Sequence, residues 1–158
     1  MNQEIERKFL VRNDAWRAHT TAIRPIRQAY LCADPHRSVR IRIAGADAWL
    51  TIKGATQGLT RAEYEYPIPH DHALDILDHL CTTGEINKTR HLVPHGTLMF
   101  EVDIFHGKNE GLTLAEIELP TPDTPIQLPP WIGQEVTGDP RYFNAYLARH
   151  PFTTWPTT

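Results

Sequence analysis

The stretch EIERKFLV, residues 4–11, decides how the rest of the chain is interpreted. Side chains of a β-strand alternate between its two faces, so a strand here places Glu4, Glu6 and Lys8 on one face and apolar side chains on the other. Two acids and one base on a single line suit a metal ion beside a phosphate group. A solvated strand with a chance order of charges explains the same pattern, so the choice depends on the later strands.

The composition indicates one globular domain without a strong charge bias. The chain has 158 residues, 41% of them hydrophobic and 22% charged, with a formal net charge of −3. We expect a single domain over residues 1–158 with its own core. Because the overall charge attracts neither nucleic acid nor membrane, an anion site needs a local concentration of bases. No apolar run approaches a membrane span and no signal-like segment is evident, which predicts a cytoplasmic protein.

Alternation of apolar and charged residues predicts seven strands after the first. In the clearest case, Val39, Ile41 and Ile43 oppose Arg40 and Arg42. Except for 48–53, the strands offer one apolar and one charged face. With the first strand, the predicted ranges are 4–11, 26–31, 38–44, 48–53, 61–68, 85–93, 98–105 and 112–119.

Two helices and one irregular segment complete the predicted elements. Apolar residues at helical spacing predict a helix over 70–80. Asp139-Pro140 fits an N-cap followed by proline at the first helical position, which predicts a closing helix over about 141–149. The proline-rich stretch of about 120–130 is expected to be irregular. Both helices are available to cover apolar strand faces from outside.

Charged side chains on one face of the strands comprise eight acids and six bases. About eight antiparallel strands tend to close, because closure removes unpaired edges. The expected fold is therefore mainly β (α+β), a closed eight-stranded antiparallel β-barrel with flanking helices. Patterning alone favours an apolar lumen, because unpaired buried charges are costly. A wet lumen in which charges meet counterions is the alternative.

The order of the charges resembles that of the CYTH superfamily, the triphosphate tunnel metalloenzymes. Glu4-Ile5-Glu6-Arg7-Lys8 is similar to the ExExK signature of that family, and Glu135-Val136-Thr137 with Arg141-Tyr142 resembles the end of its short bacterial members. The likeness covers essentially the whole chain. It implies that the charged faces turn inward and line a tunnel that binds a triphosphate together with Mg²⁺ or Mn²⁺.

The resemblance implies a role for each group of charged residues. The implied metal ligands are Glu4, Glu6, Glu116 and Glu118. The implied phosphate-binding residues are Lys8, Arg40, Arg42, Lys53, Lys88 and Arg90. Residues expected to order these bases by salt bridges, or else to position metal and water, are Glu63, Glu65, Glu101 and Asp103. The candidate catalytic residues are Glu4, Glu6, Lys8 and Tyr30, the tyrosine as a hydrogen-bond donor in preference to a proton-transfer group.

The expected activity is metal-dependent hydrolysis of inorganic triphosphate (tripolyphosphate) or a related triphosphate. In this hypothesis one metal bridges the triphosphate oxygens, while a second metal or a glutamate orients water onto the terminal phosphorus. A class IV-type adenylate cyclase, a thiamine or nucleoside triphosphatase, and a non-catalytic polyphosphate or nucleotide binder are the alternatives. The binder is disfavoured because four carboxylates would repel phosphates unless metals intervened. The expected partner is the small-molecule substrate, with no nucleic acid polymer and no membrane; the oligomeric state, a homodimer included, stays open.

Overall fold

We describe residues 2–157 of a computed structural model of the chain. Nine strands are formed by these residues: β1 Gln3–Val11, β2 Ala22–Asp34, β3 Arg37–Ala44, β4 Asp47–Gly54, β5 Thr60–Pro67, β6 Ile86–His95, β7 Leu98–Phe105, β8 Thr113–Glu118 and β9 Ile132–Glu135. The helices are α1 His70–His79 and α2 Asn144–Leu147. Short 3-10 turns are η1 Ala15–His19, η2 Gly107–Asn109, η3 Pro140–Tyr142 and η4 Phe152–Thr154.

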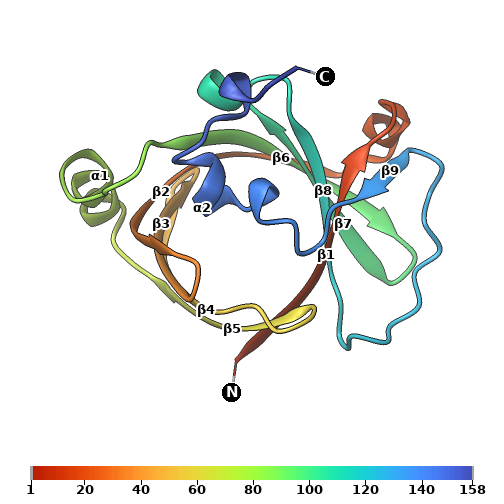
Figure 1. The fold of residues 1–158 in the computed structure, drawn as a ribbon, viewed down its shortest axis with the longest axis horizontal. Coiled ribbons are helices and arrows are strands. Elements are labelled where there is room, and N and C mark those ends of the chain that lie inside the picture. Colours follow the sequence, from red (N-terminus) through yellow and green to blue (C-terminus); the bar gives the residue numbers. More distant parts are fainter. Residues whose placement is uncertain (1, 158) are drawn as a thin grey trace.

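Strands β1 to β8 close into an antiparallel barrel (Figure 1). The hydrogen-bonded order is β5-β4-β3-β2-β6-β7-β8-β1, and β1 returns to β5 with Glu4 opposite Arg61. The second half of the same β1 edge pairs with β9, where Phe9 lies opposite Glu135. The predicted eight-stranded antiparallel barrel is confirmed, and the short β9, which patterning did not predict, extends the sheet beyond it.

The charged faces of the strands turn into the barrel, so the apolar lumen that patterning favours is wrong. Glu4, Glu6 and Lys8 line an internal cavity of about 470 Å³. The outward Phe9 of the same strand is fully buried in a core outside the barrel wall. The two faces of β1 are therefore both covered, one by the charged cavity and the other by apolar packing.

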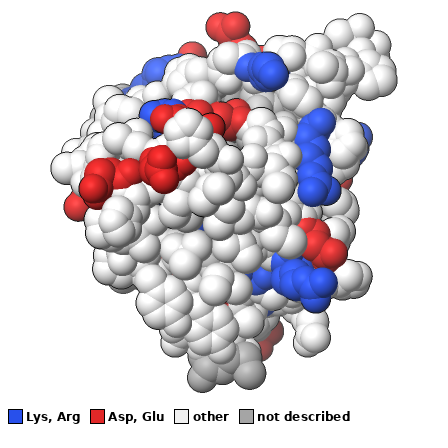
Figure 2. All heavy atoms as spheres, turned by 90° about the vertical axis from the view of Figure 1, so that its left-hand side faces the viewer, with Lys and Arg blue, Asp and Glu red and all other residues white. Residues whose placement is uncertain are grey.

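Cover for the outer face comes from helix α1 and from irregular segments. Trp16 of η1 and Trp131, before β9, pack with Phe9 over β1, β6, β7 and β8. On the opposite wall, Ala73 of α1 packs on Ile41 of β3, as predicted for the helix over 70–80. The irregular 120–130 segment contains no helix or strand, as expected. Figure 2 shows the outer face on the α1 side, where charged residues form small separate groups among uncharged surface.

The segment expected to form a helix over 141–149 instead splits into η3 and α2, because Phe143 between them is extended. Nor does it cover the outer wall: α2 lies across an opening of the barrel (Figure 1). Leu147 packs there with Phe105 and Leu114, which are inward-facing but apolar. An apolar helix face is needed at this end because the lumen stops being polar. None of the helices formed by residues 2–157 is long and apolar enough to cross a membrane.

Candidate active site

Inward-facing side chains from all eight barrel strands meet in the cavity. The charged and tyrosine residues singled out from the sequence that line it are Glu4, Glu6, Lys8, Tyr30, Arg40, Arg42, Lys53, Glu63, Glu65, Lys88, Arg90, Glu101, Glu116 and Glu118. Asp103 does not line the cavity, because it is fully buried behind two of the bases. The structure thus brings every predicted site residue to one place, although they come from positions 4 to 118 of the chain.

Asp103 anchors two bases from the neighbouring strand β6. Its carboxylate accepts hydrogen bonds from Lys88 Nζ at 2.7 Å and from Arg90 Nε and Nη2, each at 2.8 Å. Burial alone would raise the pKa of Asp103, but the charges of Arg90 and Lys88 lower it, so the carboxyl is ionised. Asp103 therefore fixes the direction in which both bases enter the cavity.

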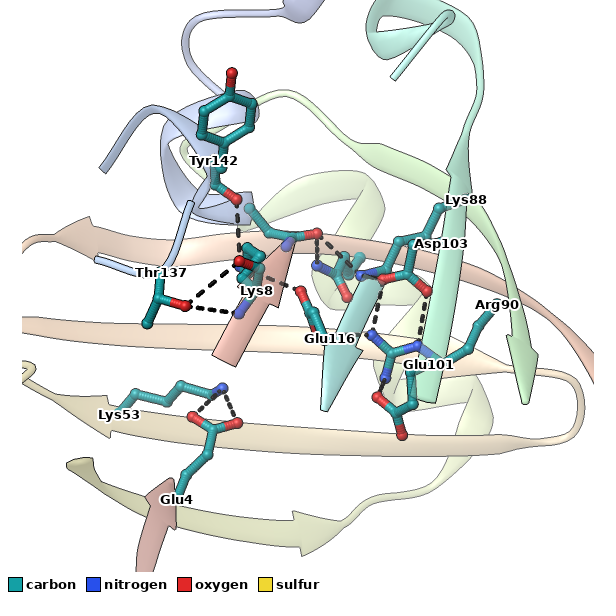
Figure 3. Close-up of polar contacts among 12 residues, drawn as sticks. Glu4, Lys8, Lys53, Lys88, Arg90, Glu101, Asp103, Glu116, Thr137 and Tyr142 are labelled. Atoms are coloured by element: carbon teal, nitrogen blue, oxygen red, sulfur yellow. Dashed lines mark hydrogen bonds and ion pairs between the residues drawn. The ribbon is translucent and has the colours of Figure 1, made fainter. Parts of the chain in front are cut away.

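Arg90 and Lys8 share a further carboxylate, that of Glu116 on β8 (Figure 3). Lys8 Nζ lies 3.2 Å and Arg90 Nη2 3.3 Å from the Glu116 oxygens. Burial raises the pKa of Glu116, but the surrounding bases outweigh it and hold that pKa well below its usual value. Arg90 also pairs with Glu101, Nη1 to Oε2 at 2.5 Å. Together with Asp103, the two glutamates surround one guanidinium.

A second ion-pair cluster holds Glu4 on the other side of the cavity. Lys53 Nζ donates to both Glu4 oxygens at 2.8 Å and lies 3.0 Å from Glu63, while Arg61 Nε donates to Glu4 at 3.1 Å. Burial would raise the pKa of Glu4, but Lys53 and Arg61 lower it to about 2. Glu4 is thus fully ionised and already has two cationic partners.

The two arginines of β3 have few acidic partners. Arg40 Nη2 donates to the Thr51 hydroxyl at 3.2 Å, which donates to Glu65 at 2.8 Å. Within residues 2–157, Arg42 makes no ion pair, and its Nε donates to the Gln28 side-chain oxygen at 2.8 Å. Burial, then the charges of Arg40 and Arg90, lower the pKa of Arg42. An anion in the cavity would relieve this uncompensated positive charge.

Glu6 and Glu118, in contrast to the β3 arginines, are acids without a basic partner among the described residues. They face each other across β1 and β8, and neither makes an ion pair or a side-chain hydrogen bond within residues 2–157. Burial, then the charge of Glu116, raise the pKa of Glu6 to about 7. Burial, then Glu4, also raise the pKa of Glu118. Adjacent carboxylates that repel one another are stabilised by a divalent cation.

The donor set fits a hard cation that keeps other ligands. In the part of the chain that the structure describes, no group of three or more His, Cys, Asp or Glu side chains is arranged to hold a metal alone. Mg²⁺ is usually bound by one or two carboxylates and completes its shell with water and substrate phosphates. The free oxygens of Glu6 and Glu118 meet that requirement, with Glu4 and Glu116 nearby but paired with bases.

Several cavity residues were not predicted. Arg61 could have been found, because it alternates with Glu63 and Glu65 on one strand face. Gln28 of β2 is fully buried beside the cavity, where it contacts Arg42, and patterning gives it no role. Asn144, like Tyr146, Arg149 and His150 at the opening, comes from the C-terminal segment and has no pattern that places it there.

Comparison with known proteins agrees with this geometry. The CYTH domain family model matches residues 2–145, and the chain belongs to this family. An inorganic triphosphatase from Acetivibrio thermocellus is 44% identical over 96% of this chain and 97% of its own length. One from Nitrosomonas europaea is 38% identical, over 92% and 96%. The crystal structure of an inorganic triphosphatase, 31% identical, superposes with a TM-score of 0.65 over 99% of each chain.

Proposed function

We propose that this protein is a divalent-metal-dependent inorganic triphosphatase that hydrolyses tripolyphosphate. The observation that carries the proposal is that one cavity holds two carboxylates, Glu6 and Glu118, and a guanidinium, Arg42, none of which has an ion-pair partner within residues 2–157. Metal and phosphate together would compensate both charges. The names of the two bacterial relatives support this substrate.

The bases of the cavity would hold the triphosphate. The proposed phosphate-binding residues are Lys8, Arg40, Arg42, Lys53, Lys88 and Arg90. Guanidinium groups bind phosphate oxygens in pairs, and lysines add point charges. Glu63, Glu101 and Asp103 keep Lys53, Lys88 and Arg90 extended into the cavity through the ion pairs described above, and Glu65 holds Arg40 through the Thr51 hydroxyl. A triphosphate would then meet cations already directed inward, so binding requires little rearrangement.

The carboxylates would hold the metal and orient the reacting water. The proposed ligands are Glu4, Glu6, Glu116 and Glu118, with Glu6 and Glu118 the freest. Bound Mg²⁺ or Mn²⁺ would neutralise charge on the phosphate oxygens and acidify a water. In this scheme Glu4 and Glu6 also direct water toward the terminal phosphorus, Lys8 stabilises negative charge on its oxygens, and Tyr30 donates a hydrogen bond to one of them.

Product analysis tests the function directly. Purified protein is incubated with tripolyphosphate, thiamine triphosphate or ATP, with Mg²⁺ or Mn²⁺ or with EDTA, and orthophosphate and cyclic AMP are measured. We expect orthophosphate from tripolyphosphate at the highest kcat/KM and none in EDTA. Cyclic AMP as the main product from ATP, or no turnover of any triphosphate with either metal, would overturn the proposal.

A further inference from the structure

The C-terminal segment touches the bases of the cavity at two points. The backbone oxygen of Tyr142 accepts a hydrogen bond from Lys8 Nζ at 3.3 Å (Figure 3). Two residues later, the side-chain oxygen Oδ1 of Asn144 accepts from Lys88 Nζ at 3.1 Å. The same oxygen accepts from Gln28 Nε2 at 3.1 Å. The segment is therefore part of the polar lining as well as an apolar cover.

These contacts continue to Arg42 through one buried amide. Gln28 is fully buried, and its Oε1 accepts from Arg42 Nε at 2.8 Å. The resulting chain runs from Lys88 through Asn144 and Gln28 to Arg42. It joins a base of β6 to a base of β3 by way of two residues, Gln28 of β2 and Asn144 of α2.

Lys88 and Arg42, the two bases at the ends of this series of hydrogen bonds, determine which way both amides point. Protonated lysine and arginine can only donate hydrogen bonds. Asn144 must therefore turn its oxygen to Lys88, which leaves Gln28 to donate its NH₂ to that oxygen. Gln28 then presents its own oxygen to Arg42, which donates in turn. Flipping either amide would place donor against donor at one or more of these contacts, and an unsatisfied buried donor is costly.

We propose that Asn144, acting with Gln28, is a positioning residue that aims Lys88 and Arg42 at the triphosphate. This inference rests on the proposed function for the identity of the ligand. Arg42 has no carboxylate to hold it within residues 2–157, and its side chain is held by the hydrogen bond from its Nε to the Gln28 oxygen. Lys88 has Asp103 on one side, and Asn144 supplies a second acceptor. Without Asn144, the Gln28 amide loses its partner and Arg42 loses a fixed direction.

Calorimetric titration with tripolyphosphate in EDTA tests the inference without turnover. We compare the wild type with Asn144→Ala, Gln28→Ala and the double variant. A hydrogen bond to a charged group is strong enough for its loss to weaken binding by about tenfold. We expect Kd to rise about tenfold in each single variant and by little more in the double, because both act through one chain. With Mg²⁺, KM should rise similarly while kcat stays within about twofold.

Asn109→Ala is the matched control. Asn109 is also buried, and its Oδ1 accepts from the Phe152 backbone at 2.8 Å, so it ties the C-terminal segment to the barrel outside the cavity. We expect Asn109→Ala to lower Tm and to leave Kd within about twofold of wild type. Asn144→Leu, which keeps bulk but removes the oxygen, serves if Asn144→Ala does not fold. It should raise Kd as Asn144→Ala does.

Any of four results would overturn the positioning role. Three concern the variants: an unchanged Kd in the folded Asn144 variants, an equal loss of binding in Asn109→Ala, and single-variant effects that multiply in the double. A wild type that does not bind tripolyphosphate in EDTA would overturn it as well. Failure of the proposed function looks different: the wild type would bind tripolyphosphate but release no orthophosphate with Mg²⁺ or Mn²⁺, and the Kd comparison would still decide the inference.

Discussion

Two glutamates on one strand face show how strongly the cavity separates otherwise similar groups. Glu4 and Glu6 are two residues apart on β1, yet the pKa of Glu4 is lowered to about 2 and that of Glu6 raised to about 7. Burial favours the protonated acid in both. The difference comes from Lys53 and Arg61, which contact Glu4, whereas Glu116 repels Glu6. The sequence pattern predicts that both line the barrel but cannot show which one has a base beside it.

Glu6→Gln should strongly reduce turnover and preserve the fold. The substitution keeps the shape and removes one of several repelling carboxylates, so Tm should stay equal or rise. It also removes a proposed metal oxygen, and we expect turnover of tripolyphosphate with Mg²⁺ to fall by about 100-fold or more. The control is Glu135→Gln on the outer wall, where Glu135 pairs with Arg7. Glu6→Gln with turnover near that of the control would contradict the metal role.

Lys88 should make triphosphate binding sensitive to pH. Burial lowers the pKa of Lys88 to about 7, against the attraction of Asp103 and Glu116 and with added repulsion from Arg90 and Arg42. Above that pH the ammonium loses its proton, so KM should rise between about pH 7 and 9. The unfolded chain keeps this proton to about pH 10.5, so the Lys88 contribution to the free energy of unfolding increases with pH over the same window.

The variant Lys88→Arg isolates this effect. An arginine stays protonated throughout the range, so KM should change less between pH 7 and 9 than in the wild type. Steady-state kinetics at fixed Mg²⁺ and ionic strength provide the measurement. An equal rise of KM in both proteins would assign the pH dependence to another group.

Among the secondary-structure elements, strands with regular alternation of apolar and charged residues could be predicted from the sequence. The predicted bounds were wrong where that alternation is interrupted. β7 is found at its predicted bounds, 98–105. β2 runs from Ala22 to Asp34, although the predicted range was 26–31. The prediction started too late because Arg24-Pro25 interrupts the alternation, yet this part of the strand still pairs with β6. The four-residue β9 and the split of the C-terminal helix depend on tertiary contacts with β1 and the barrel opening. Local sequence carries no signal for either.

Trp16 tests whether the irregular elements support the barrel from outside. This side chain is fully buried in the outer core and packs edge-on against His91 at a centroid distance of 4.9 Å. Trp16→Ala should lower the free energy of unfolding by about 3–5 kcal/mol in urea, with KM unchanged at temperatures where the variant is folded. Ile23→Ala, at a residue 59% exposed, should cost under about 0.5 kcal/mol. A Trp16→Ala protein as stable as that control would contradict the proposed outer core.

For the whole molecule, the decisive question is which face of the closed sheet turns inward. Period-two alternation predicts that Glu6 and Lys8 lie on the same face of the strand, but it does not predict whether that face points into the barrel or out of it. The free-energy cost of burying unpaired charges favours an apolar barrel interior, which is wrong because the charges in this barrel are largely paired. In the structure Lys88, Arg90 and Asp103 satisfy one another, so charges occupy the interior as an ion-pair network. The resemblance in charge order supplied what single-strand physics could not.

The proposed function requires the inward charged surface to hold a triphosphate and a divalent metal together. A crystal structure with Mn²⁺ and a non-hydrolysable imidotriphosphate, with the metal located by anomalous scattering, would show where each one binds. We expect Mn²⁺ bonded to oxygens of Glu6 or Glu118, and phosphate oxygens within hydrogen-bond distance of Arg42 and Lys88. Phosphate and metal bound on the outer wall, with the cavity holding only water, would contradict it.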